Sequence, residues 1–237
     1  IFVTENFLPK KQVKDENSDD GGVPTLKMNA TKKFTTGVYP YSLMMSVYTP
    51  IQRDEFPRSL KISVSEQDWC GHMYSQLNYR DQAYNLTMHS YFEQEADFEK
   101  DLGNNLPEDE LWNLLRMDPQ ALPTGEFQLI PNQLFCRLLH KENQAQPAKA
   151  SLDTTTWKGQ TLGQYRLFYP KWERSLSIYF QQDFPYRIEG WEETYPSLPI
   201  NGEGKLTTTA VRQKTMKTDY WSKNARKDAK LRKKLGI

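Results

Sequence analysis

The fold of this chain is decided by residues 68–95, which read DWCGHMYSQLNYRDQAYNLTMHSYFEQE. If the segment folds back about Arg80-Asp81, with Tyr79 opposite Gln82, the apolar side chains of both arms meet on one face of an antiparallel sheet. These apolar side chains are Trp69, Met73, Leu77, Tyr84, Leu86, Met88 and Phe92. The segment therefore predicts a β-hairpin with one buried face and one face open to solvent or to a ligand.

The opposite face of the predicted hairpin carries most of the reactive side chains of this segment. They are Asp68, Cys70, His72, Tyr74, Gln76, Thr87, His89, Tyr91 and Glu93. In the assumed register His72 lies directly opposite His89. A register shift of two residues would keep both faces but would separate the two histidines. The register therefore decides whether this face is a site or a row of separate polar groups.

Several interpretations of this polar face are open. A wall of aromatic and polar groups would bind a small ligand, and its members would be Cys70, His72, Tyr74, His89, Tyr91 and, from a later segment, Trp191. A metal-assisted hydrolase would instead hold a divalent ion, with Asp68, His72, His89 and Glu93 as its ligands. A thiol nucleophile with a histidine base is a weaker option, because alternate residues of one strand lie about 7 Å apart. The simplest interpretation is a solvated outer face.

Short runs of alternating or β-branched apolar residues recur along the rest of the chain at spacings typical of antiparallel sheets. Strands are expected at the start of the chain and at residues 26–36, 41–48, 60–65, 127–130, 134–139, 149–154, 164–169, 175–181, 186–191 and 205–215. A change of phase between the apolar residues of 60–64 and those of 69–73 predicts a β-bulge within residues 65–68.

Two helices are expected among these strands. Pro107 opens a short one over residues 107–117, with three acidic residues in its first turn, which suits the helix dipole. Asp219 caps a basic terminal helix that runs to about residue 235. Tyr220 and Trp221 on its apolar side predict that it docks on the sheet, and contact with an anionic surface is the alternative.

The predicted fold class is mainly β: a curved antiparallel sheet or partly closed β-barrel with a short mid-chain helix and a C-terminal helix. We expect a single domain over residues 1–237, with a possible seam near residues 141–147. The oligomeric state stays open.

The composition excludes several classes of function. The formal charge of the 237 residues is +1, so no overall field predicts binding to nucleic acid. No apolar run approaches the roughly 20 residues that span a bilayer, and no phosphate loop, dinucleotide turn or nucleophile elbow predicts a cofactor or an acyl-transfer site.

Cys70 and Cys136 are expected to be half-buried thiols, although a disulfide between them stays open. Glu192 and Glu193 are adjacent, so a strand would point them to opposite faces and not pair them for acid–base catalysis.

Eight stretches of the chain resemble an uncharacterised group of envelope lipoproteins from Bacteroidetes. The stretches are LPKKQV (8–13), KMNATKKF (27–34), TGVYPYS (36–42), DWCGH (68–72), SYFE (90–93), LPTG (122–125), LSIYF (176–180) and WEET (191–194). The resemblance implies a β fold, a lipid anchor on a segment upstream of this chain, and a periplasmic or outer-membrane-anchored location in the cell envelope. It implies no catalytic residues.

The same group carries the label "septum formation inhibitor Maf", which names nucleotide pyrophosphatases with a Ser-x-Ser-Pro-Arg-Arg motif and alternating helices and strands. Neither the motif nor that alternation occurs in this chain, so the label does not transfer. The leading hypothesis is a non-catalytic envelope protein that binds a small or lipidic ligand, or an envelope partner, through its curved sheet. A metal-assisted hydrolase and a purely structural interaction module are the alternatives.

Overall fold

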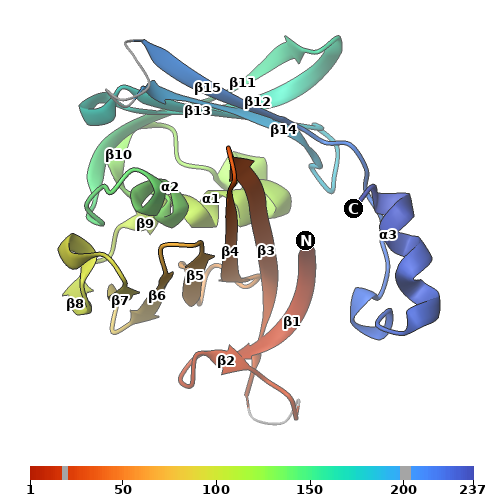
Figure 1. The fold of residues 1–237 in the computed structure, drawn as a ribbon, viewed down its shortest axis with the longest axis horizontal. Helices are drawn as coiled ribbons and strands as arrows, with labels where there is room; N and C mark the ends of the chain where they lie inside the picture. The colour runs from red at the N-terminus through yellow and green to blue at the C-terminus, as the bar shows by residue number, and fades with distance from the viewer. Residues whose placement is uncertain (18–20, 198–203) are drawn as a thin grey trace.

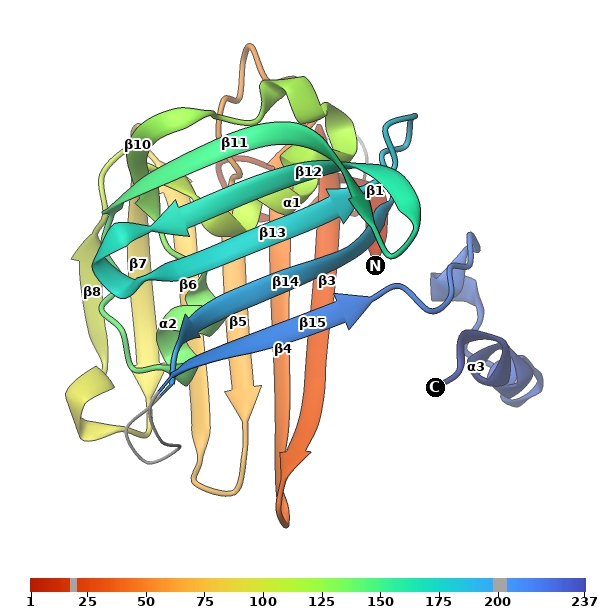
Figure 2. The same cartoon turned by 90° about the horizontal axis from the view of Figure 1, so that it is seen from above.

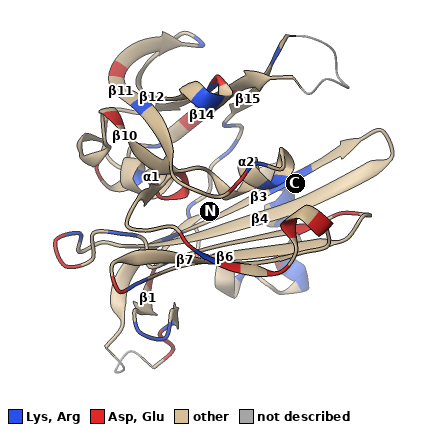
Figure 3. Ribbon diagram, turned by 90° about the vertical axis from the view of Figure 1, so that its left-hand side faces the viewer, with Lys and Arg blue, Asp and Glu red and all other residues tan. Residues whose placement is uncertain are grey.

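Two sheets face one another across a layer that contains two helices (Figure 1). The computed structural model describes residues 1–17, 21–197 and 204–237. Figure 3 shows the sheets edge-on with α1 and α2 in the space between them. The predicted mainly-β class is confirmed, and the strand ladders are antiparallel apart from one short parallel pair between β9 and β10.

The first sheet has eight strands and curls around the helical layer (Figures 1 and 2). Its spatial order is β2-β1-β3-β4-β5-β6-β7-β8. The strands are β1 (Phe2–Leu8), β2 (Val13–Lys14), β3 (Val23–Thr36), β4 (Tyr39–Pro50), β5 (Lys61–Gln67), β6 (His72–Arg80), β7 (Ala83–Ser90) and β8 (Phe98–Asp101). Alternation along these strands places Met45, Val47, Ile62 and Val64 on the face that meets the helices, because successive side chains of a strand point to opposite faces.

The second sheet has seven strands in the order β15-β14-β13-β12-β11-β10-β9. They are β9 (Leu106–Pro107), β10 (Gly125–Ile130), β11 (Gln146–Trp157), β12 (Gln160–Tyr169), β13 (Arg174–Phe180), β14 (Ile188–Pro196) and β15 (Lys205–Val211). Leu167, Leu176 and Ile178 form the centre of its buried face.

The mid-chain helix α1 (Glu108–Met117) joins the two cores. Leu111 and Leu115 pack in the core of the second sheet, and Trp112 packs against the cores of both sheets. Short 3-10 turns connect other elements: η1 (Glu93–Glu95), η2 (Pro119–Ala121), η3 (Pro170–Trp172), η5 (Tyr220–Ser222) and η6 (Arg226–Ala229).

The strand expected at residues 134–139 is wrong, because this segment forms the helix α2 (Gln133–Leu138). Asn132 caps the helix: its side-chain oxygen accepts a hydrogen bond of 2.9 Å from the backbone N–H of Phe135. An asparagine cap of this kind satisfies a free N–H of the first helical turn. Leu134, Phe135 and Leu138 then point toward the layer between the sheets, where they line a cavity.

The β-bulge expected within residues 65–68 is also wrong. Strand β5 ends at Gln67 and pairs with β6 in register, Gln67 opposite His72, so residues 68–71 are the loop of a hairpin. The side chain of Asp68 accepts hydrogen bonds from the backbone N–H groups of Cys70 and Gly71 at 2.6 and 3.1 Å. This loop, not an inserted residue, changes the phase of the apolar pattern.

A C-terminal helix is present but shorter than expected: α3 spans Lys230–Leu235. Figures 1 and 2 show the backbone of the segment from η5 onward beside the two sheets. Trp221 is 63% exposed, so its expected docking is wrong, whereas Tyr220 is 38% exposed and lies near enough to Tyr48 of β4 to contribute to the raised pKa of that residue. Contact with an anionic surface stays a prediction. No helix in the described part of the chain is long and apolar enough to cross a membrane.

Candidate functional site

The β6–β7 hairpin turns one residue later than the sequence predicted. Tyr74 pairs with His89, and the turn residues are Asp81 and Gln82, with φ values of 50° and 62°. Positive φ at both central residues gives the twist that a two-residue hairpin turn requires. The expected pairing of His72 with His89 is therefore wrong. The strand register differs from the expected one by two residues, which leaves both faces unchanged.

The division of the hairpin into a buried and an outward face is confirmed. The buried members are Met73, Leu77, Tyr84, Leu86 and Met88. Two members of the expected apolar face lie outside the strands and depart from it: Trp69 is exposed in the turn before β6, and Phe92 is only half-buried after β7. On the outward face His72, Tyr74 and His89 are exposed.

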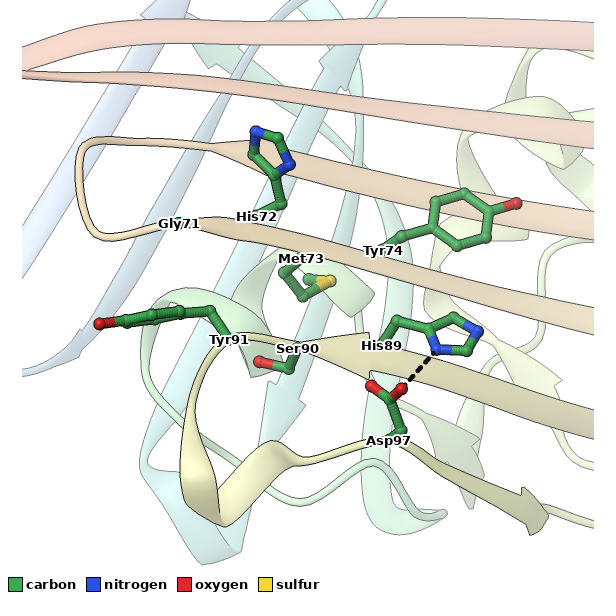
Figure 4. Close-up of a pocket in the computed structure, with 8 residues that line it drawn as sticks. All are labelled: Gly71, His72, Met73, Tyr74, His89, Ser90, Tyr91 and Asp97. Carbon is green, nitrogen blue, oxygen red and sulfur yellow. Dashed lines mark ion pairs between the residues drawn. The ribbon is translucent and has the colours of Figure 1, made fainter.

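Four of the six predicted ligand-wall residues line one hollow on this outward face, with a volume of about 420 Å³. They are His72, Tyr74, His89 and Tyr91 (Figure 4). Cys70 is exposed in the neighbouring turn, and Trp191 lies on the other sheet. The hollow is shallow and open to solvent. It offers a surface contact and no enclosure that would exclude water from a reaction.

The predicted metal set is not assembled. Asp68 is occupied by the turn that it caps, and Tyr39 also donates to it through its hydroxyl at 3.0 Å. His89 Nδ1 lies 3.1 Å from a carboxylate oxygen of Asp97, a contact drawn in Figure 4. Glu93 begins η1 and is exposed. Among residues 1–17, 21–197 and 204–237, no group of three or more His, Cys, Asp or Glu side chains is placed to hold a metal ion.

The strand expected over residues 186–191 does not end at Trp191: β14 continues to Pro196, so the acidic segment that follows Trp191 belongs to the strand. Glu192 and Glu193 point to opposite faces, which confirms the expected alternation. Glu192 accepts hydrogen bonds from the indole of Trp157 at 3.2 Å and the hydroxyl of Tyr179 at 2.8 Å. Glu193 instead points between the two sheets, where it meets Arg174.

A second and more enclosed cavity of about 360 Å³ lies between the sheets. Strands β3 and β4 form one wall, β13 and β14 the opposite wall, and α1 and α2 the sides. Its apolar lining includes Met28, Ala30, Met45, Trp112, Leu134, Leu138, Leu176, Ile188 and Trp191. A concave, mainly apolar cavity with a few polar groups is the usual form of a small-molecule site, for which volumes of about 300–1,000 Å³ are typical.

The polar centre of this cavity is a buried ion cluster around Arg174. Its Nη1 and Nη2 donate to the two carboxylate oxygens of Glu108 at 2.6 and 2.7 Å, and its Nε donates to Glu193 at 2.7 Å. Tyr169 donates its hydroxyl to Glu108 at 2.8 Å. The guanidinium also stacks 4.1 Å from the ring centroid of Phe135. Arg174 and Glu108 are 2% and 1% exposed, so this pair is closed to bulk water.

The ion cluster fixes its own protonation states. Burial by itself would lower the pKa of Arg174, but the Glu108 carboxylate and its hydrogen bonds outweigh burial and raise that pKa. Burial, followed by the charge of Glu108, raises the pKa of Tyr169. Both side chains therefore keep their protons at neutral pH, and every nitrogen of Arg174 is engaged by a carboxylate.

Sequence reasoning placed only Trp191 in this cavity and missed the ion cluster. One signal could have found it. Arg174 shares the phase of Leu176, Ile178 and Phe180 along β13, so the alternation that buries those three residues also buries the arginine. A buried arginine requires an acidic partner, and the acidic start of α1 supplied one.

Searches of protein-family models, curated proteins and solved structures find no match to this chain.

Proposed function

We propose that this chain is a binding protein that holds a small, mainly apolar or lipidic ligand in the cavity between its two sheets. The cavity carries the proposal: it is enclosed by both sheets and both helices, and apolar side chains form most of its lining. The guanidinium of Arg174 is shared by the carboxylates of Glu108 and Glu193. One negative charge in the charged centre is therefore left unbalanced. The proposed location is the cell envelope, and the resemblance to envelope lipoproteins supports it.

The chemistry of the lining supports binding over catalysis. Among the described residues that line the cavity there is no histidine, cysteine or serine, so the common pair of a serine or cysteine nucleophile with a histidine base is absent from this lining. The carboxylates are held by Arg174 and Tyr169 in contacts of 2.6 to 2.8 Å. A polar centre whose carboxylates are fixed in this way orients a ligand more readily than it transfers a proton.

The experiment is a titration of the purified chain with N-phenyl-1-naphthylamine, a neutral apolar fluorophore. Ala30 lines the cavity from β3, so Ala30→Trp would fill it. Ala96 is exposed and lies outside the cavity, so Ala96→Trp is the matched control. We expect saturable binding by the wild type and by Ala96→Trp, and a loss of at least about tenfold in affinity for Ala30→Trp. Absence of saturable binding by the wild type, or equal binding by folded Ala30→Trp, would refute the proposal.

A further inference from the structure

Lys32 is the remaining cationic side chain among the described residues that line the cavity, and its environment differs from that of Arg174. It projects from β3 on the same side as Met28 and Ala30, which lie four and two residues earlier, so alternation points it into the cavity. Among the described residues, Lys32 forms no ion pair and no hydrogen bond. It is held between two aromatic rings, with its Nζ 6.0 Å from the ring of Trp191 and 5.9 Å from that of Phe34.

The nearby carboxylate does not neutralise Lys32. Glu193 is the next inward residue after Trp191 on β14, about 7 Å further along the strand. Its Oε1 accepts from the guanidinium of Arg174 at 2.7 Å, and the described chain shows no salt bridge between Glu193 and Lys32. The positive charge of Lys32 is therefore free to meet an anion at the Trp191 end of the cavity.

From this arrangement we propose that the ligand is an anionic amphiphile whose single head group binds Lys32 while its apolar body fills the cavity. The inference rests on the proposed function and names the ligand class. Arg174 does not hold the head group, because carboxylates of the chain already occupy all three of its nitrogens. The rings of Trp191 and Phe34 hold the lysine by cation–π contact and give the head group an apolar border, so the ion pair forms with less competition from water.

The test compares dodecanoate, dodecyl phosphate and dodecanol as competitors for N-phenyl-1-naphthylamine. The three have unbranched alkyl chains of closely matched length, so they separate the head group from the apolar body. We expect both anions to bind the wild type more tightly than the alcohol. Lys32→Gln should weaken binding of the anions by about tenfold or more, the effect of one charge-assisted hydrogen bond, while changing dodecanol binding by less than about threefold. The two anions also distinguish a carboxylate from a phosphate head group.

Lys33 provides the matched control. It is the next residue on β3, it is exposed, and alternation points it away from the cavity. Lys33→Gln removes the same charge and should leave all three affinities unchanged, and Lys32→Arg should restore anion binding. Thermal unfolding checks that Lys32→Gln is folded, which we expect because the described structure shows no ion pair of Lys32 that the substitution would remove.

The outcomes separate the two proposals. Equal binding of dodecanoate and dodecanol to the wild type, or an equal loss in Lys32→Gln and Lys33→Gln, overturns the assignment of the head group and leaves the apolar cavity in place. Binding of the fluorophore with displacement by none of the three amphiphiles also overturns the amphiphile inference. Failure of the fluorophore to bind the wild type overturns the proposed function itself.

Discussion

Replacing Arg174 by methionine should destabilise the fold strongly at neutral pH and much less in acid. Methionine has a similar length and no charge, so it removes the hydrogen bonds to Glu108 and Glu193 but keeps most of the apolar contact. Glu108 is 1% exposed and would keep only the hydroxyl of Tyr169 at 2.8 Å and the backbone N–H of Asn132 at 3.2 Å as donors.

The magnitude follows from the cost of an unpaired buried carboxylate. Removing one partner of a buried ion pair costs about 3–5 kcal/mol. The carboxyl can escape part of this cost by taking up a proton. Protonating an ordinary glutamate at pH 7, about 2.7 units above its usual pKa, costs about 3.7 kcal/mol. That figure is a ceiling on the charge penalty, which stays below it. Together with about 1–2 kcal/mol of lost packing and hydrogen bonds, we expect Arg174→Met to lose about 3–4 kcal/mol at pH 7.

The sign of the pH dependence follows from the same reasoning. As pH falls toward about 4.3, protonation becomes free and the penalty of the unpaired charge disappears. The difference between wild type and Arg174→Met should therefore shrink to the lost packing and hydrogen bonds, about 1–2 kcal/mol. The double variant Glu108→Gln with Arg174→Met removes both charges and should recover most of the loss at pH 7.

Urea unfolding followed by tryptophan fluorescence measures both effects. With a denaturant slope of about 3 kcal/mol per molar, the midpoint of Arg174→Met should lie about 1 M below that of the wild type at pH 7. Glu193→Gln serves as the comparison, because Glu193 is more exposed than Glu108 and its loss leaves Arg174 paired. A midpoint shift for Arg174→Met below about 0.3 M, or one that is equal at pH 4 and pH 7, would show that the ion pair is not buried as described.

Three further predictions test other parts of the fold. Cys70 is exposed, whereas burial raises the pKa of the Cys136 thiol; one thiol per chain should react quickly with Ellman's reagent, and the second only after unfolding. Burial, and secondly the charge of Glu108, raises the pKa of Asp109 well above its ordinary value. The free energy of unfolding of the wild type should therefore fall as pH rises through that pKa. Asp109→Asn should become more stable than the wild type over the same pH range, as measured by urea titration. A Cβ on Gly190 would lie 2.3 Å from the Trp157 ring, so Gly190→Ala should lower the free energy of unfolding by at least about 1–3 kcal/mol by urea titration, and an unchanged midpoint would refute that contact.

The period of the apolar residues predicted most of the strands and the faces of the central hairpin. Met73, Leu77, Leu86 and Met88 are buried as the alternation indicated, because a half-buried strand must place every second side chain in the core. Alternation with a period of two residues cannot detect a two-residue shift in strand register, because the shift leaves both faces unchanged. The predicted pairing of His72 with His89 failed for this reason. The backbone of the turn fixes the register instead. It required left-handed conformations at Asp81 and Gln82, and glutamine gives little sign of this preference.

Local competition explains the errors in secondary structure. The apolar run at residues 134–139 fits a short strand or a short helix by length, and periodicity does not separate the two in so few residues. The cap at Asn132 decides for the helix. At the other end of the chain, Tyr220 and Trp221 gave the terminal segment an apolar side, yet both are exposed. Amphipathic pattern predicts that a segment can dock, while shape and charge decide whether it does.

The cavity between the sheets lay beyond sequence reasoning for a different reason. Alternation assigns Lys32 to one face of β3 and Trp191 to one face of β14, and both assignments can be read from single strands. It does not say that these two faces, 159 positions apart in the chain (191 minus 32), oppose one another across the cavity. What the sequence does offer is a charge in the phase of a buried face, as with Arg174 among the apolar residues of β13. A buried charge must find a partner from another element. Each inward-facing charge therefore marks a place where two distant segments meet. Lys32 has no carboxylate partner in the described chain, so we expect the ligand to supply the negative charge that pairs with it.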